Sequence, residues 1–98
     1  MRFEWDTEKN RTNISKHQLD FADVWKVFTR PVLVFPDERI DYGEDRFIAI
    51  GLLDETRVVV VVYTESDKDV IRVISFRKAL THERKRYGQA FRDEFGLF

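Results

Sequence analysis

The feature that most constrains the fold is an uninterrupted run of six apolar residues from Val58 to Tyr63. A strand that is covered on both faces has such a run, whereas a half-exposed strand alternates apolar and polar residues. Polar turns at 54–57 and 65–69 bound the run. Beyond these turns, 47–53 and 70–76 are further strand-like segments. Connections this short predict an antiparallel meander with 58–63 as its central strand.

Three helices and two further strands are predicted around the meander. Residues 2–5 alternate in polarity as a short strand does, and Asp6 is a suitable N-cap for a helix that runs to about Lys16. A second helix ends at Arg30-Pro31, before a strand at 32–35, and a last helix runs from about Thr81 to Gly96. The apolar faces predicted for the second and last helices consist of Phe21, Val24, Trp25, Phe28, Leu80, Tyr87, Phe91 and Phe95.

The order β-α-α-β-β-β-β-α indicates an α+β fold, with helices packed on an antiparallel sheet. A chain of 98 residues predicts a single domain over 1–98. It contains no cysteine, which excludes disulfides and thiolate metal sites. It shows no apolar signal segment and no apolar run of membrane-spanning length, so we expect a cytoplasmic location.

The charge is distributed unevenly along a chain whose formal net charge is −1. Residues 23–71 contain eleven acidic and six basic side chains, whereas 72–86 contain six basic side chains and one acidic one. A local basic patch on a nearly neutral body suits a small anionic target or an acidic partner. A solvated helix face explains the same cluster, so charge alone does not decide between these functions.

Several common kinds of site are missing from the sequence. It has no glycine-rich phosphate loop, no nucleophile elbow and no pair of histidines at helical spacing. The acidic segment 37–46 has carboxylates that suit Mg²⁺, but it lacks the regular ligand spacing of a calcium loop. We therefore expect a solvated loop there, and neither a metal nor a cofactor.

Cations in unusual positions are the remaining chemical signal. Arg72 lies within a strand, where strict alternation places it on one face with Val70 and Ile74, and Arg77 follows at the end of that strand. Arg46 begins another strand of the same sheet. Guanidinium groups suit bidentate binding of a phosphate, so three of them on one sheet are candidates for a phosphate clamp. Pairing of Arg72 with a carboxylate of the acidic loop is an equally good explanation.

For the other candidate site residues, a purely structural role explains the sequence as well as a functional role does, or better. His17 ends the first helix, where a histidine commonly caps carbonyl groups. Tyr87 belongs to an apolar helix face and is expected in the core. Lys9, Asn13 and Lys16 share a narrow arc of the first helix and are explained equally well as solvated side chains.

Three blocks of the sequence together resemble the BrnT family of toxins over residues 2 to about 88. The first is Phe3-Glu4-Trp5-Asp6-x-x-Lys9-x-x-x-Asn13-x-x-Lys16-His17, followed by Phe21-Ala22. The second is Gly43-Glu44-Asp45-Arg46-Phe47-x-x-Ile50-Gly51. The third is Ile71-Arg72-Val73-Ile74-Ser75-x-Arg77-Lys78-Ala79, with Glu83-Arg84-x-x-Tyr87.

This resemblance implies a RelE-like α+β ribonuclease toxin of a type II toxin–antitoxin system, whose RNA cleavage inhibits translation. The implied partner is a ribbon-helix-helix antitoxin of the BrnA type, which alone would contact operator DNA, and no membrane is involved. The implied catalytic residues are His17, Arg46, Arg72, Arg77 and Tyr87. The implied RNA-binding residues are Lys9, Asn13, Lys16, Lys78 and Arg84.

Residue types suggest the mechanism. The 2′-hydroxyl of RNA would be the nucleophile, arginines would stabilise the phosphorane, and cleavage without a metal would leave a 2′,3′-cyclic phosphate. Histidine has an ordinary pKa that suits a base near neutral pH, which favours His17 for that role. The alternative function is a non-catalytic binding module, or an inactive toxin homologue that acts with its partner in transcriptional autoregulation.

Overall fold

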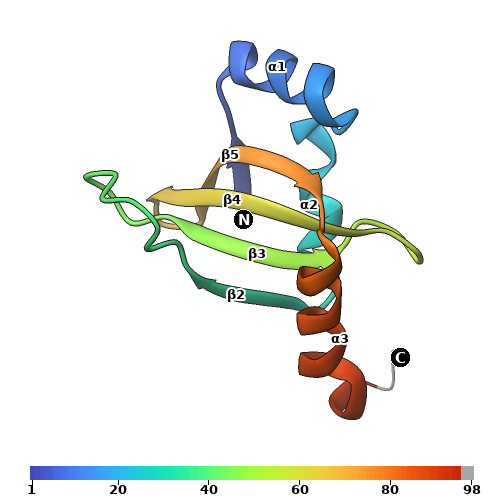
Figure 1. Ribbon diagram of the computed structural model, residues 1–98. Coiled ribbons are helices and arrows are strands. Elements are labelled where there is room, and N and C mark those ends of the chain that lie inside the picture. Colours follow the sequence, from blue (N-terminus) through green and yellow to red (C-terminus); the bar gives the residue numbers. More distant parts are fainter. Residues whose placement is uncertain (96–98) are drawn as a thin grey trace.

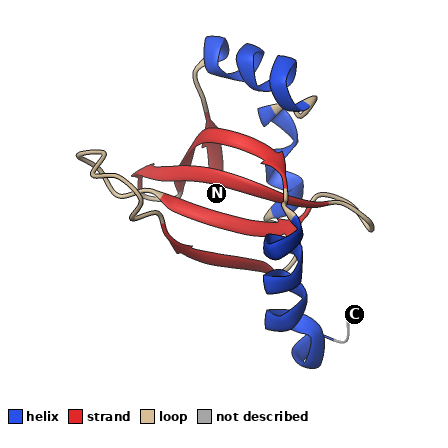
Figure 2. Ribbon diagram, viewed as in Figure 1, coloured by secondary structure: helices blue, strands red, loops and turns tan. Residues whose placement is uncertain are grey.

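The computed structural model describes residues 1–95, with side chains described up to Phe91. One sheet forms its centre, and helices lie at one end and on both faces (Figures 1 and 2). No helix within the described residues has the length and apolar character that a membrane span requires. In chain order the elements are β1 (Arg2–Glu4), α1 (Thr7–His17), the 3₁₀ helix η1 (Phe21–Asp23), α2 (Val24–Val27), β2 (Val32–Pro36), β3 (Phe47–Leu52), β4 (Val58–Asp67), β5 (Val70–Lys78) and α3 (Thr81–Phe95).

The sheet has the strand order β1-β5-β4-β3-β2. Strands β3 to β5 form the predicted antiparallel meander, with the apolar run in the central strand β4, and β2 pairs antiparallel with β3 at its edge. The pairing of β1 differs from the predicted antiparallel sheet, because β1 lies parallel to β5 and makes the sheet mixed. The chain leaves β1, passes through α1, η1, α2 and three strands, and only then reaches β5. This long connection allows the parallel pairing, since a parallel pair requires a crossover.

Two hydrophobic cores cover the two faces of the sheet, as the uninterrupted apolar run of β4 predicts. On the rear face, η1 and α2 pack against Val59, Val61 and other buried residues. On the front face, which is nearer the viewer in Figure 1, α3 packs against Ile50 and Val60 through Tyr87. The helix α3 crosses only one end of the front face, so the rest of that face lacks a helical cover (Figure 1).

The helices follow their sequence signals with local exceptions. Asp6 caps α1 as predicted, because its carboxylate accepts hydrogen bonds from the backbone N–H groups of Glu8 and Lys9. The predicted second helix is a 3₁₀ turn followed by one α-helical turn, and Trp25 is 51% exposed instead of buried. Leu80 precedes α3 and is 56% exposed, so it is not part of the apolar face of α3. Gly96 and the side chain of Phe95 lie outside the described residues.

Candidate active site

A β-bulge in β5 places two arginines on the same face of the sheet. Arg72 lies opposite Thr64 and Arg77 lies opposite Val60, both on β4, but the register shifts by one residue between them, around Ile74. Strict alternation would have put positions 72 and 77 on opposite faces. The bulge therefore turns Arg77 onto the front face with Arg72. Bulges are common next to functional sites, where they redirect a side chain in this way.

Arg46 extends the row of Arg72 on the front face. It lies two residues before Ile48 of β3, on the same side of that strand, and the hydroxyl of Thr64 donates to the carbonyl oxygen of the adjacent Asp45 at 2.8 Å. With neighbouring strands about 4.8 Å apart, the Cα atoms of Arg46 and Arg72 lie about 10 Å apart, on either side of β4. Arg72 borders a hollow of about 470 Å³ that it shares with the carboxylates of Glu44 and Glu65, whereas Arg46 lines the neighbouring hollow of the acidic segment.

Arg77 does not join Arg46 and Arg72 at one point. Its partner on β4, Val60, is four residues from Thr64, which corresponds to about 13 Å along the strand. The three predicted arginines thus share the front face, but they form a pair at one end and a single cation at the other. This separation fits contacts to two different phosphates better than a triple clamp on one.

Each of these three arginines has a carboxylate partner. Arg72 pairs with Glu4 of β1 at 3.6 Å, not with the acidic loop that sequence reasoning had offered as its alternative partner. Arg46 lies 3.4 Å from Glu44 and stacks over Tyr42, with its guanidinium carbon 3.9 Å from the ring centroid. Ion pairs with exposed partners contribute little stability, so an incoming phosphate can displace such carboxylates at small cost.

The Arg77–Glu83 pair is tighter and partly buried. The two guanidinium nitrogens of Arg77 donate to the two carboxylate oxygens of Glu83 at 2.8 and 2.9 Å. Glu83 also accepts the backbone N–H of Leu80 at 2.7 Å, which is the reciprocal half of a capping box at the start of α3. Arg77 therefore fixes α3 to the end of β5.

Replacing Glu83 with glutamine is expected to give a pH-dependent loss of stability. The hydrogen bonds from Arg77 lower the pKa of Glu83 from its ordinary value of 4.5. The pair therefore stabilises the folded chain above about pH 4.5, and this stabilisation is lost as the pH falls through the lowered pKa. At pH 7, Glu83→Gln should reduce the free energy of unfolding by about 1–2 kcal/mol, measured with urea. The deficit should shrink at pH 3. Glu55→Gln, in an exposed turn, is the control, and a deficit that does not vary with pH would contradict this account.

A groove of about 410 Å³ lies between α1 and β5. The side chains of Lys9, Lys16 and His17 line its α1 wall, and Ile74 and Ser75 line its β5 wall. Ser75 pairs with Val62, whose side chain lies on the front face, so the groove opens beside the arginine face. The structure thus brings a histidine and two lysines of one helix to the edge of the surface that carries the arginines.

His17 does not cap α1, so the helix-capping role considered for it in the sequence is wrong. The following residue, Gln18, closes the helix in a left-handed conformation with φ of 56°. Its backbone N–H donates to the carbonyl of Ile14, and its side-chain amide donates to the carbonyl of Ser15. His17 is half-buried in the groove instead.

Asn13 and Tyr87 are structural residues in this fold. The Asn13 side chain is 6% exposed, and its amide bonds to both the N–H and the carbonyl of Phe76 and to the carbonyl of Leu19. The Asn13 amide therefore satisfies backbone groups at the edge of β5 that a neighbouring strand would otherwise bind. Tyr87 is fully buried, its hydroxyl donates to the carbonyl of Pro31 at 2.7 Å, and burial raises its pKa. Tyr87 is therefore not accessible to a bound RNA, whereas Asn13 also lines the groove between α1 and β5, with its amide already bonded to the backbone.

Asn13→Ala is expected to lower the free energy of unfolding by about 3 kcal/mol, because it leaves several buried backbone groups of Phe76 and Leu19 without partners. Urea denaturation of the purified variant measures this loss. Ser15→Ala, at an exposed position of the same helix, should change stability by less than about 0.5 kcal/mol. An Asn13→Ala variant as stable as this control would show that the amide does not hold α1 to β5.

Lys78 and Arg84 lie apart from the groove. Lys78 pairs with Val59, whose side chain is in the rear core, so Lys78 is on the opposite side of β5 from Arg77. The guanidinium group of Arg84 bonds to the carbonyl of Ala79 and the hydroxyl of Thr81, at the junction of β5 and α3. The structure therefore does not bring these two predicted RNA-binding residues to the α1 wall.

The acidic segment forms the walls of another hollow, of about 510 Å³, at residues 36–47. Its one buried carboxylate, Asp37, accepts two hydrogen bonds from the Arg39 side chain, which lower its pKa to about 2. Arg39 and the Tyr42 hydroxyl both donate to Asp37, and these hydrogen bonds hold the loop together. Within the described part of the chain, no three histidine, aspartate or glutamate side chains are grouped so that they could hold a metal ion.

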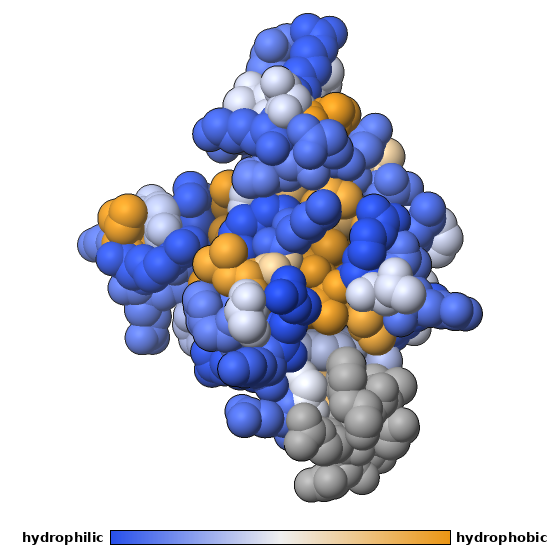
Figure 3. All heavy atoms as spheres, turned by 45° about the vertical axis from the view of Figure 1, so that its right-hand side comes forward, coloured by the Kyte–Doolittle hydropathy of each residue, from blue (hydrophilic) through white to orange (hydrophobic). Residues whose placement is uncertain are grey.

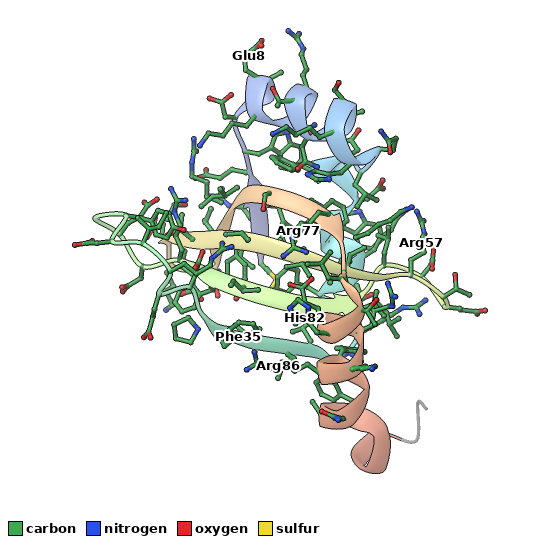
Figure 4. All side chains as sticks on the ribbon, viewed as in Figure 1. Glu8, Phe35, Arg57, Arg77, His82 and Arg86 are labelled. Carbon is green, nitrogen blue, oxygen red and sulfur yellow. The ribbon has the colours of Figure 1, made fainter. Side chains whose placement is uncertain are left out.

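Sequence reasoning missed a stacked pair on the front face. The guanidinium carbon of Arg86, on α3, lies 4.2 Å from the ring centroid of Phe35, on β2 (Figure 4). Phe35 continues across the sheet to Ile48 and Val62, which are paired neighbours. Apolar side chains are visible over the middle of the sheet between hydrophilic surroundings (Figure 3). The helical spacing of Glu83 and Arg86 was the available signal, since it places both on the side of α3 that faces the sheet.

The fold and the site define a small α+β protein with a cationic groove beside an arginine-bearing sheet face. A family model described as "Ribonuclease toxin, BrnT, of type II toxin-antitoxin system" matches residues 5–83. The crystal structure of the Brucella abortus ribonuclease toxin BrnT is also similar, with 35% sequence identity and a TM-score of 0.70. The match covers 83% of this chain and 99% of the Brucella chain. Among curated proteins, no significant match is found.

The chain therefore belongs to the BrnT family of ribonuclease toxins. This confirms the family, the α+β fold class and the endoribonuclease class predicted from sequence. Membership of a type II system also means that its partner is a cognate antitoxin. The family match ends at Glu83, so most of α3, including Arg86, lies beyond it.

Proposed function

We propose that this toxin cleaves RNA without a metal ion, in the α1–β5 groove and on the adjoining arginine face, and that this cleavage inhibits translation. The observation that carries the proposal is the position of His17 in a groove that opens beside the face bearing Arg72. Lys9 and Lys16 line the same wall, where their charges suit the RNA backbone. A general base and phosphate-binding cations thus border one surface.

The reaction needs no nucleophile from the protein. The 2′-oxygen of a ribose attacks the adjacent phosphorus while His17 takes the 2′-hydroxyl proton. The bond from phosphorus to the 5′-oxygen breaks, the 5′-oxygen takes a proton from solvent, and a 2′,3′-cyclic phosphate remains. Arg46 and Arg72 stabilise the charge that develops on the phosphorane oxygens, where preorganised guanidinium donors are most effective. Arg77 adds positive charge farther along the face and positions α3 through Glu83.

The partner in this proposal is a ribbon-helix-helix antitoxin of the BrnA type, which would also contact operator DNA. The sequence resemblance to the BrnT family supports this part. An antitoxin encoded beside the toxin and built on that fold should co-purify with the chain and abolish its RNA cleavage. Co-purification of an antitoxin with a different DNA-binding fold would contradict the ribbon-helix-helix assignment.

The decisive experiment incubates the antitoxin-free chain with a defined single-stranded RNA in excess EDTA. We expect cleavage at the same rate as with Mg²⁺ present, and product ends that carry 2′,3′-cyclic phosphate, identified by mass spectrometry. A rate that EDTA abolishes, or products with 3′-hydroxyl ends, would contradict the mechanism. An RNA with 2′-O-methyl groups is the matched control, because it has no free nucleophile and should remain intact.

A further inference from the structure

Arg86 differs from the other arginines on the front face in its electrostatic surroundings. Arg46, Arg72 and Arg77 each lie within 4 Å of a carboxylate oxygen. Among the side chains that the structure describes, no carboxylate pairs with Arg86, which is held over the Phe35 ring instead. Within that described part its charge is therefore not neutralised by an ion pair, while the cation–π contact fixes the plane of its guanidinium group.

The stack has one free side. Phe35 covers one face of the guanidinium group, and Arg86 is otherwise exposed to solvent. The two residues lie together on the front face, at the edge of the sheet opposite to α1 (Figure 4). Unpaired nucleobases commonly stack on arginine planes and aromatic rings, which is how single-stranded RNA is bound without base pairing. A guanidinium plane that Phe35 already holds in place is therefore suited to stacking with a nucleobase.

The register of the sheet links the stack to the groove. Phe35, Ile48, Val62 and Ser75 are successive partners across β2, β3, β4 and β5. With strands about 4.8 Å apart, this row spans about 14 Å, from the Arg86 stack to the wall that Ser75 shares with His17. Val62 is buried, whereas Phe35, Ile48 and Ser75 are partly exposed, so these three side chains offer contact surface for bases between the cationic ends.

We propose that the Arg86–Phe35 stack is a subsite for a nucleobase of single-stranded RNA, next to the nucleotides that are cleaved. The inference rests on the proposed function, because it assumes that RNA occupies the front face. It adds a subsite that lies outside the family match, on the part of α3 beyond Glu83. The base stacks on the exposed face of the guanidinium group, and the positive charge also attracts the neighbouring phosphates.

Affinity for an uncleavable RNA tests the subsite. The probe is a single-stranded 2′-O-methyl oligonucleotide, and its dissociation constant is measured by fluorescence anisotropy for the wild type and three variants. Arg86→Lys keeps the charge but loses the planar group, and Phe35→Leu keeps apolar bulk but loses the ring. Each should weaken binding about tenfold. Arg57→Lys, in the distant β3–β4 turn, should bind like the wild type (Figure 4).

Removing one base of the probe at a time sharpens the test. At the position that contacts the stack, an abasic probe should bind the wild type about tenfold more weakly and the Arg86→Lys variant no more weakly than the intact probe does. Thermal unfolding of both variants checks that they are folded. Arg86→Lys is at an exposed position, so it remains informative if Phe35→Leu does not fold.

Two outcomes would overturn the proposal. Unchanged affinity of the folded Arg86→Lys variant would mean that its planar group contacts no base. Unchanged RNA affinity with weakened binding of the antitoxin would assign the stack to the protein interface. Because the probe cannot be cleaved, a chain that binds it through this stack but leaves ordinary RNA intact would contradict the proposed function and not the subsite.

Discussion

Arg72→Ala is expected to lower kcat for RNA cleavage by about 10²- to 10³-fold, the usual cost of removing one donor that stabilises an oxyanionic transition state. Arg72 lies across β4 from Arg46 on the front face, and its pair with Glu4 is exposed enough for a phosphate to replace the carboxylate. Single-turnover cleavage of a defined RNA measures the effect. KM should rise as well, because the same guanidinium group binds the ground-state phosphate.

Arg57→Ala is the matched control for this prediction. Arg57 is also an exposed arginine paired with a carboxylate, Asp54, but it lies in the turn between β3 and β4, away from the groove (Figure 4). It should cleave at the wild-type rate. A folded Arg72→Ala variant that cleaves as fast as Arg57→Ala would remove Arg72 from the site.

His17→Ala is expected to reduce kcat by about 10²- to 10⁴-fold, the usual contribution of a positioned general base. The groove gives the lost imidazole a defined space between α1 and β5, so added imidazole should restore part of the activity. The measurement is the cleavage rate as a function of imidazole concentration. A structural role for His17 would not produce this rescue.

His82→Ala serves as the control for the second histidine of the chain. His82 is exposed in the first turn of α3, on the far side of β5 from α1. We expect it to retain wild-type cleavage and to show no response to imidazole. If His82→Ala, and not His17→Ala, loses activity and is rescued, the general base lies on α3 and the assignment to His17 is wrong.

The meander could be predicted because its signals are local. The apolar run of β4 and the short turns on either side determine strand length, burial and antiparallel pairing within a few residues of one another. The pairing of β1 could not, because three residues carry little pattern and their partner, β5, lies more than sixty residues away in sequence. Trp25 matched a helical stripe, but α2 lasts only one turn, so that side chain points outward.

The candidate site was predictable as a set of residues but not as an arrangement. Arg72 stood out because a cation within a strand is costly, and Arg46 and Arg77 stood out because they begin or end strands of the same sheet. Their common face depends on the bulge at Ile74, which no local pattern announces, and without it Arg77 would point to the rear. Asn13 appeared to be a solvated polar residue of α1, since its role depends on an exposed backbone edge at Phe76 that only the assembled sheet creates.

The parallel pairing of β1 with β5 has a consequence for when the toxin becomes active during its synthesis. Glu4 pairs with Arg72, and Asn13 binds the backbone of Phe76, so the groove forms only when β1 and α1 have met β5, a segment more than fifty residues away in sequence. Contacts of such sequence separation form late in folding. A nascent chain whose β5 has not yet left the ribosome, or a chain truncated before β5, has no groove. A chain in synthesis therefore cannot assemble the groove before residues 70–78 have left the ribosome.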